Sequence, residues 1–152
     1  MFKKLFPSII CLISLAIVVF LVPSKHNSAT ISITTNTGKE VLFNLTHADT
    51  PEKRERGLMY VATLADDAAM LFIFAEESRR DFWMRNTLMP LDMIFFNTDF
   101  QIVDIIENAM PCTSDPCTVY SSLKPAQYVL EIKAGQTKAK QIQIGNQAKW
   151  YR

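Results

Sequence analysis

The sequence predicts an α+β domain that is predominantly β: a compact, small barrel-like domain of seven or eight short strands with one or two short helices. Short apolar or β-branched runs recur from residue 31 onward, separated by clusters of Asn, Gly, Pro and Asp. One stretch, Thr50-Pro51-Glu52, has the residues of a strong helix start. A closed or half-closed barrel is the expected architecture, because closure hides strand edges.

The first half of the domain is predicted to contain a hairpin, a short helix and a buried strand. The runs 31–35 and 41–45 flank a turn-forming segment and predict the hairpin. A charged helix should follow from residue 51 to about residue 57, because Thr50 suits the N-cap and proline suits the first helical position. Residues 70–74 are apolar throughout, which is typical of a strand buried on both faces.

The second half is predicted to be built around a central strand from Leu91 to Phe96. Alternation places Leu91, Met93 and Phe95 on one face of this strand, with Asp92, Ile94 and Phe96 on the other. We expect a hairpin partner at 101–107 to follow, and then a loop at 108–124. A strand is expected at 128–133, with Tyr128, Leu130 and Ile132 inward. A helical turn at 137–141 and a last short strand to Trp150 should complete the domain.

The N-terminus predicts export. Lys3 and Lys4 precede an apolar run over residues 5–22, and the chain then turns polar. The run is long for a cleaved signal and near the lower limit for a spanning helix, so both outcomes stay open. The predicted organisation is a signal peptide or N-terminal membrane anchor at 1–24, a polar tether at 25–30 and a single β-rich domain at 31–152. We therefore expect a periplasmic or other extracytoplasmic location, with residues 5–22 as an inner-membrane tether if the leader is retained.

Charge and cysteine usage narrow the function classes. Without Lys3 and Lys4 the chain has 14 basic residues against 15 acidic residues, which argues against nucleic acid as a partner. Cys112 and Cys117 flank Thr-Ser-Asp-Pro, and in an oxidising compartment they predict a small disulfide staple. A redox pair is the alternative, although the spacing differs from the thioredoxin motif. The two histidines lie far from these cysteines in sequence, so we expect no metal site and no cofactor.

Several motifs occur in a recognisable order along the chain. They are Gly57-Leu58-Met59, Met70-Leu71-Phe72 with Phe74, the stretch from Phe82 to Asp92, Tyr128 to Glu131 with Ala134-Gly135, and Gly145. In these motifs the chain strongly resembles the domain-of-unknown-function 192 family over roughly residues 31–150. The resemblance implies a single small, mainly β domain, often exported, and it implies no reaction. Ala69, Arg85 and Asn146 stand where the family more often has glycine, lysine and aspartate.

The stretch from Phe82 to Asp92 permits two interpretations. In the architectural one, Phe82, Trp83 and Met84 fill the core, Asn86 and Thr87 satisfy turn amides, and Asp92 accepts hydrogen bonds that a buried carboxylate needs. In the functional one, the stretch is the wall of a pocket for a small polar ligand such as a sugar or peptide. The candidate ligand-binding residues are Trp83, Asn86, Thr87 and Asp92, completed by Arg56, Arg85 and Glu131.

The expected function is a non-catalytic binding or accessory module of the cell envelope, with a small polar ligand or an envelope protein as its partner. No catalytic residues are assigned, because neither histidine accompanies a recognisable nucleophile motif. The chief alternative is a small envelope hydrolase acting on polysaccharide or peptide, with Asp92 and Glu131 as its carboxylate pair. The third is a Cu(I)-binding protein whose thioether ligands come from Met59, Met70, Met84, Met89, Met93 and Met110.

Overall fold

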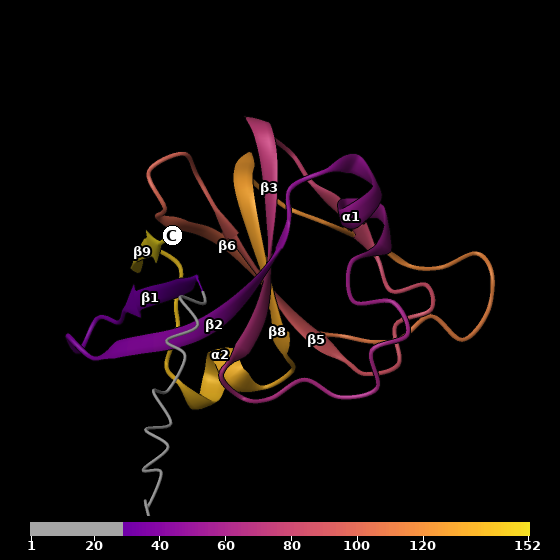
Figure 1. The fold of residues 1–152 in the computed structure, drawn as a ribbon, viewed down its shortest axis with the longest axis horizontal. Coiled ribbons are helices and arrows are strands. Elements are labelled where there is room, and N and C mark those ends of the chain that lie inside the picture. The colour runs from indigo at the N-terminus through magenta and orange to yellow at the C-terminus, as the bar shows by residue number, and fades with distance from the viewer. Residues whose placement is uncertain (1–28) are drawn as a thin grey trace, which may run out of the picture.

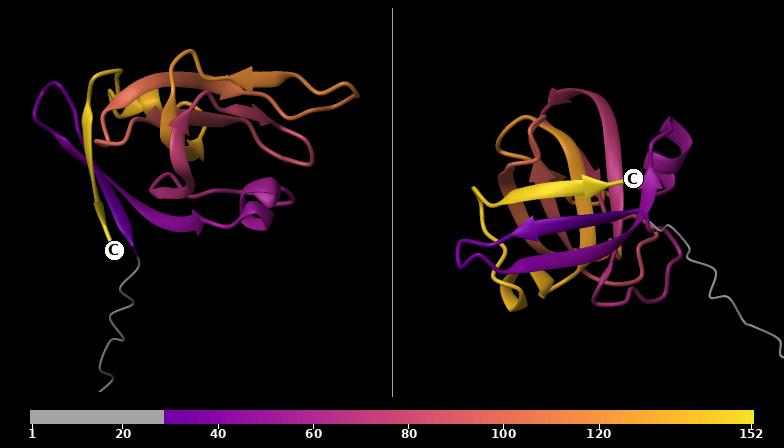
Figure 2. Two further views of the ribbon diagram at one scale, coloured as in Figure 1. Left: turned by 90° about the horizontal axis from the view of Figure 1, so that it is seen from above. Right: turned by 60° about the vertical axis from the view of Figure 1, so that its left-hand side comes forward.

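The computed structural model describes residues 29–152, so the predicted leader and most of the tether lie outside the described residues. Within this range, seven strands form one sheet in the order β6-β5-β8-β3-β2-β1-β9, and β4 and β7 form a separate two-stranded sheet. The large sheet curls strongly (Figures 1 and 2). No helix of the described residues is long and apolar enough to cross a membrane.

The first half of the fold follows the predicted order. An antiparallel hairpin is followed by a short helix, and β3 returns parallel to β2. Thr50 caps the helix as expected, because its side chain accepts a hydrogen bond from the backbone N–H of Lys53. The bounds are β1 Thr30–Thr34, β2 Glu40–Ala48, α1 Pro51–Arg56 and β3 Ala68–Ser78.

The second half holds the centre of the sheet. β5 is buried along its whole length and pairs antiparallel with both β6 and β8. α2 lies between β8 and β9, at the predicted helical turn. The bounds are β4 Asp81–Trp83, β5 Leu91–Phe96, β6 Ile102–Ala109, β7 Val119–Ser121, β8 Ala126–Lys133, α2 Gln136–Ala139 and β9 Gln147–Tyr151.

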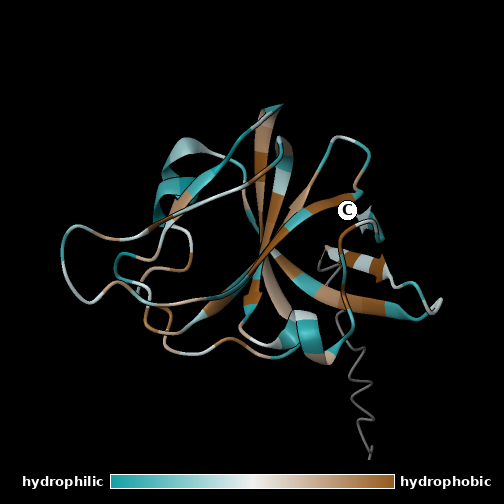
Figure 3. Cartoon of the chain, turned by 180° about the vertical axis from the view of Figure 1, so that it is seen from behind, coloured by the Kyte–Doolittle hydropathy of each residue, from teal (hydrophilic) through white to brown (hydrophobic). Residues whose placement is uncertain are grey.

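The sheet is a half-closed barrel, as the sequence predicts. Its edge strands β6 and β9 meet at one end, where Gln101 forms a single bridge with Gln147. A first core, which includes Ile31, Leu71 and Ile94, draws on all seven strands and therefore fills the inside of the curl. Figure 3 shows the central strands as mainly hydrophobic and both helices as mainly hydrophilic.

A second core lies on the other face of β3, β5 and β8. It includes Leu58, Phe72, Met84 and Val129, and Phe82 packs against it. The segment after α1 and the β4–β7 ribbon thus cover this face, and α1 lies across the molecule from β1 and β9 (Figure 1).

Three details correct the sequence analysis. The described residues form nine strands rather than seven or eight, because Asp81–Trp83 pairs with Val119–Ser121, which lies inside the predicted loop at 108–124. β3 extends from Ala68 to Ser78, beyond both ends of the predicted strand at residues 70–74. β8 is buried on both faces, since Val129 and Glu131 lie under the second core while Leu130 and Ile132 face the first.

Candidate functional site

An open groove lies between α1 and the turn that follows β4. It has a volume of about 510 Å³ and leads into a narrow inner pocket of about 30 Å³, room for one or two water molecules. The groove is lined by Glu52, Glu55, Arg56, Met59, Trp83, Arg85 and Asn86. The inner pocket shares five of these residues and adds Arg54, Gly57, Leu58, Phe72, Phe82, Thr87 and Glu131.

One wall comes from α1 and the turn after it. Thr50 and Pro51 start the helix, which is less than two turns long. Arg54, Glu55 and Arg56 therefore lie at its end, beside the groove. Gly57 then ends the helix with φ of +47°, and a Cβ atom at this position would lie 3.1 Å from Cζ of Phe72. Glycine is therefore required for both conformation and space.

The opposite wall is the Trp83-to-Thr87 stretch, in which Met84 and Thr87 are buried and the other three residues are exposed. Met84 is 1% exposed and anchors the stretch in the second core, whereas Trp83 is 45% exposed. The carbonyl oxygen of Met84 accepts hydrogen bonds from the backbone N–H groups of Thr87, at 3.3 Å, and Cys112, at 3.0 Å. Asn86 adopts φ of +55°, which asparagine tolerates, and its carbonyl oxygen accepts from Tyr60 N–H at 2.8 Å. This last bond joins the two walls.

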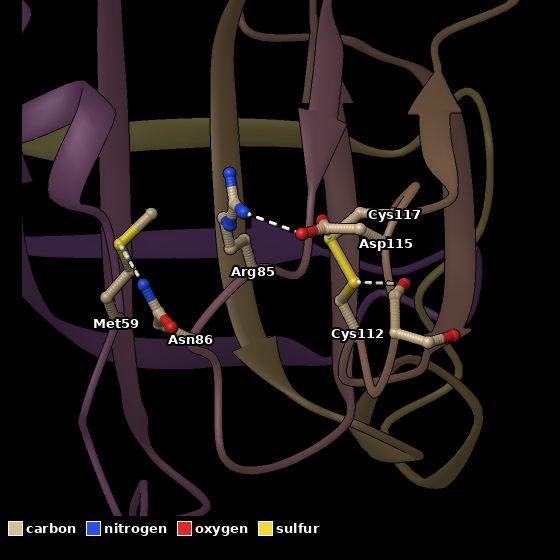
Figure 4. The surroundings of a disulfide bond; sticks show 7 residues. Met59, Arg85, Asn86, Cys112, Asp115 and Cys117 are labelled. Atoms are coloured by element: carbon tan, nitrogen blue, oxygen red, sulfur yellow. Dashed lines mark hydrogen bonds and ion pairs between the residues drawn. A yellow bond between two sulfur atoms is a disulfide. The ribbon is translucent and has the colours of Figure 1, made fainter.

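Arg85 connects the groove to the disulfide loop. Its guanidinium lies 5.3 Å from the centre of the Trp83 ring and donates to Oδ2 of Asp115 at 2.9 Å. Asp115 belongs to the short loop closed by the Cys112–Cys117 disulfide, which the structure confirms. Figure 4 shows the salt bridge and the disulfide side by side, with Met59 and Asn86 nearby. The staple thus holds the acidic partner of Arg85 in place.

Glu131 lines the inner pocket. Its residue is only 4% exposed, its carboxyl oxygens keep a small contact with the pocket, and no side-chain hydrogen bond to them occurs within the described residues. Burial raises the pKa of Glu131 from its ordinary range to about 8, because the low-dielectric surroundings penalise the charged form. The carboxyl group is therefore protonated at neutral pH when the pocket holds no ligand.

The arginines around this pocket differ in how many hydrogen bonds and ion pairs they form with the rest of the protein. Arg54 donates to the carbonyl oxygens of Asp49 and Ile73 at 3.0 and 2.9 Å, and its guanidinium lies 5.2 Å from the centre of the Phe74 ring. Arg56 is exposed and forms no ion pair within residues 29–152. Arg56 and the solvent-exposed Arg85 are thus the cations best able to engage a ligand.

Asp92 lies away from this site. It is fully buried, and its carboxylate accepts from the backbone N–H of Asn108 at 2.9 Å and from Thr137 N–H and Oγ1 at 3.0 and 2.7 Å. Thr137 lies in the first turn of α2, so Asp92 ties β5 to that helix and to the end of β6. For Asp92 the architectural interpretation agrees with the structure.

The predicted carboxylate pair is wrong. In the β5–β8 register Asp92 is opposite Ile132, and Glu131 is opposite Met93. Ile132 belongs to the core inside the curl and Met93 to the second core, so the two carboxyl groups lie on opposite faces of the sheet. They cannot flank one glycosidic bond.

Comparisons with known proteins give the family. Residues 32–150 match DUF192, a family described as uncharacterised ACR. The chain belongs to the DUF192 family. The resemblance seen in the motifs is therefore confirmed, and the match covers most of the described domain.

Relatives of known sequence or structure agree with this assignment. UPF0127 protein PF1050 of Pyrococcus furiosus is 26% identical over 117 residues, which are 76% of this chain and 93% of that protein. A crystal structure of a protein from Sinorhizobium meliloti 1021, provisionally named a transcription regulator, is similar with a TM-score of 0.76 and 36% identity, over 81% of this chain and 93% of that one. The crystal structure of a protein of unknown function from Novosphingobium aromaticivorans DSM 12444 is similar with a TM-score of 0.73 and 31% identity, over 80% of this chain and 84% of that one.

Six of the seven predicted ligand-binding residues of this DUF192 domain line the groove or its inner pocket. They are Arg56, Trp83, Arg85, Asn86, Thr87 and Glu131. Sequence reasoning missed the acidic side of the groove, Glu52 and Glu55, and it missed Arg54 and Met59. The available signals were the helix start at Thr50 and the Gly57-Leu58-Met59 motif, which together require a short helix that ends against the core.

The methionines are distributed through the second core and its margins. Met84 and Met93 are buried there, and Met70 and Met89 pack against it. Met59 lies at the groove, where its sulfur is 3.9 Å from Nδ2 of Asn86, and Met110 is exposed. Core filling accounts for four of the six, and copper binding stays a prediction.

Proposed function

We propose that this DUF192 domain is a non-catalytic binding module of the cell envelope, whose groove between α1 and Trp83 holds a small polar ligand. One observation carries the proposal. Glu131 is a buried carboxyl group with no hydrogen-bond partner among the described residues, and it lines a pocket that opens into a larger groove.

An unpartnered buried carboxyl group is costly to the folded protein. Its desolvation is not offset by hydrogen bonds, which is the reason that its pKa rises to about 8. An apolar residue at position 131 would fit the second core at lower cost. A perturbed carboxyl group in a cleft is a recognised mark of a functional site, because ligand binding can supply the missing partner.

The groove has the size and chemistry of a small-molecule site. Its volume of about 510 Å³ falls inside the range of roughly 300–1,000 Å³ that is usual for such sites. Trp83 offers an exposed aromatic surface, Arg56 and Arg85 offer donors, and Glu52 and Glu55 offer acceptors. No serine, cysteine or histidine is among the residues that line the groove and inner pocket within residues 29–152, which argues against a Ser–His or Cys–His catalytic pair at this site.

Export is part of the proposal. The Cys112–Cys117 disulfide supports it, because disulfides persist mainly in oxidising compartments. The basic and apolar pattern of residues 3–22 supports it independently. An envelope location also fits a partner that is a peptide or sugar rather than a nucleic acid.

A thermal-shift screen of residues 29–152 against amino acids, short peptides, sugars and sugar acids tests the proposal. A ligand at a hundred times its Kd should stabilise the domain by about 2.7 kcal/mol. Trp83→Ala should weaken that ligand at least tenfold without unfolding the domain, because the Trp83 side chain is substantially exposed. Leu123→Ala is the matched control, since Leu123 is exposed and does not line the groove. A screen without any stabilising compound, or a hit that Trp83→Ala leaves unchanged, would refute the groove as the binding site.

A further inference from the structure

The inner pocket is lined by one buried carboxylic acid residue, Glu131, and by three arginines. Apolar side chains, including Leu58, Phe72 and Phe82, surround Glu131. The polar neighbours in the pocket are Thr87, Glu55 and the three arginines 54, 56 and 85. Glu131 therefore has room and polar neighbours on the pocket side, but no hydrogen bond to any of them within the described chain.

The arginines favour an anionic ligand group over a cationic one. Arg56 has no ion-pair partner within residues 29–152, and the salt bridge from Arg85 to Asp115 joins two exposed side chains, so water or a ligand can replace it. A cation in the inner pocket would be repelled by the arginines that line it together with Glu131. Planar guanidinium groups bind carboxylates through paired hydrogen bonds, which gives a carboxylate the better fit.

We propose that the ligand of this groove is a carboxylic acid in its anionic form, whose carboxylate enters the inner pocket, hydrogen-bonds to the carboxyl group of Glu131 and pairs with Arg56 and Arg85. This inference rests on the proposed binding function and names its ligand class. Trp83 then contacts the remainder of the ligand in the open groove, where an amino acid, a peptide C-terminus or a sugar acid fits.

Protonation of Glu131 makes this binding dependent on pH. The charged groups that share the pocket with Glu131 are Arg54, Glu55 and Arg56 on α1 and Arg85 after β4, while its neighbours on β3 and β5 are Met70 and Met93. Because the pKa of Glu131 is about 8 without ligand, the group is a donor at pH 6 and a second anion at pH 9. The affinity for a carboxylate should therefore fall as pH rises through 8, by at most tenfold per pH unit.

Three small probes of similar size but different charge test the inference on the protein expressed with its own leader and purified as processed. Acetate, acetamide and methylammonium are titrated at equal ionic strength and pH 6, and binding is followed by nuclear magnetic resonance shifts of the Trp83 indole N–H. Acetate should saturate this signal and bind at least tenfold more tightly than either other probe. Its Kd should rise at least fivefold between pH 7 and pH 9.

Single substitutions separate the contribution of Glu131 to acetate binding from that of Arg56. Glu131→Gln keeps a hydrogen-bond donor, so acetate should still bind, but its Kd should no longer change between pH 7 and pH 9. Arg56→Ala should weaken acetate at least tenfold at both pH values. Arg79→Ala, an exposed arginine that does not line the groove, should leave the Kd unchanged.

The outcomes also distinguish this inference from the proposed function. If acetamide or methylammonium binds as tightly as acetate, the ligand class is wrong and the groove remains a binding site. If acetate is selected but its Kd does not change with pH in the wild-type protein, the hydrogen bond to Glu131 is wrong and the inference is overturned in that part. If none of the probes binds while an uncharged compound from the thermal screen does, the carboxylate assignment also fails. If neither the probes nor the screen gives a ligand, both proposals fail.

Discussion

Asp92 and Glu131 are two buried carboxyl groups on neighbouring strands of one sheet, and they differ in their hydrogen-bond partners. Asp92 faces the inside of the curl and accepts three hydrogen bonds from the backbone and side chain of its neighbours. Glu131 faces the second core and accepts none from the described residues, so its pKa is raised to about 8. Burial alone therefore does not identify a functional carboxyl group. The absence of a partner beside a pocket is the distinguishing observation.

The largest effect should come from removing the satisfied carboxylate. Asp92→Ala leaves the backbone N–H groups of Asn108 and Thr137 without their acceptor, and it leaves the Thr137 hydroxyl with Glu107 as its only acceptor. At roughly 1–3 kcal/mol for each buried group, we expect the free energy of unfolding to fall by about 5 kcal/mol. Urea denaturation followed by circular dichroism measures this loss.

Asp92→Asn is the control for that measurement, since it keeps one oxygen acceptor and nearly the same volume. It should cost clearly less than the alanine variant. If Asp92→Ala lowered the free energy of unfolding by less than 1 kcal/mol, the contrast between the two carboxyl groups would not hold.

The second prediction concerns Glu131, the carboxyl group without a hydrogen-bond partner. Here we expect a substitution to raise the free energy of unfolding at high pH, whereas the substitution of Asp92 lowers it. The folded-state pKa of Glu131 lies above its unfolded value, so the folded protein binds the proton more tightly. Stability is therefore greatest below the unfolded pKa and is lost as pH rises through the folded one. With 1.36 kcal/mol per pKa unit, the wild-type protein should lose about 4 kcal/mol between pH 5 and pH 9 from this group.

Glu131→Gln removes that titration, so the variant should be more stable than the wild type at pH 9 and nearly equal to it at pH 5. Urea denaturation at both pH values measures the difference. Glu76→Gln is the matched control, because Glu76 is exposed on β3 and does not line the pocket that holds Glu131. Equal pH dependence in the wild type and in Glu131→Gln would show that Glu131 is already satisfied in the folded protein.

The fold was largely predictable because its signals are local. Alternation along residues 91–96 placed Asp92 on the face opposite Met93, and the structure confirms that arrangement. The helix start at Thr50 and the cysteine spacing were likewise confirmed. The β4–β7 ribbon was missed because its three-residue strands carry no periodic signal, and each strand depends on the other for its hydrogen bonds.

The site could be predicted only in part, because its geometry depends on pairing between distant segments. Alternation within β5 and β8 gives two faces for each strand, but only the register of Asp92 with Ile132 decides which faces coincide. That register separates Asp92 from Glu131. It also places Glu131 beside α1, whose residues precede it by more than seventy positions, and no local pattern reports such a contact.

Removing the disulfide tests whether the groove depends on the loop that carries Asp115. Replacing both cysteines, Cys112→Ser with Cys117→Ser, should lower the free energy of unfolding by about 2 kcal/mol, since the closed loop is short. The same change should free Asp115 and weaken its salt bridge to Arg85. Urea denaturation measures the first effect, and mass change on alkylation confirms that the wild-type protein lacks free thiols at these positions. A double variant as stable as the wild type would mean that hydrogen bonds such as Cys112 N–H to Met84 hold the loop without the staple.

The smallest predicted effect concerns α1, the helix that forms one wall of the groove. The Thr50 side chain accepts from Lys53 N–H at 3.3 Å, and Thr50→Ala should therefore cost about 1 kcal/mol. Because α1 is only six residues long and contains no buried residue, part of that cost should appear as fraying of Arg54 and Arg56 rather than as global unfolding. Amide hydrogen exchange should then accelerate in residues 53–57 and remain unchanged in β5 and β8. Thr50→Ser, which keeps the capping oxygen, should exchange like the wild type. Equal acceleration in the central strands would instead mean that the wall of the groove and the core around Asp92 open as one unit.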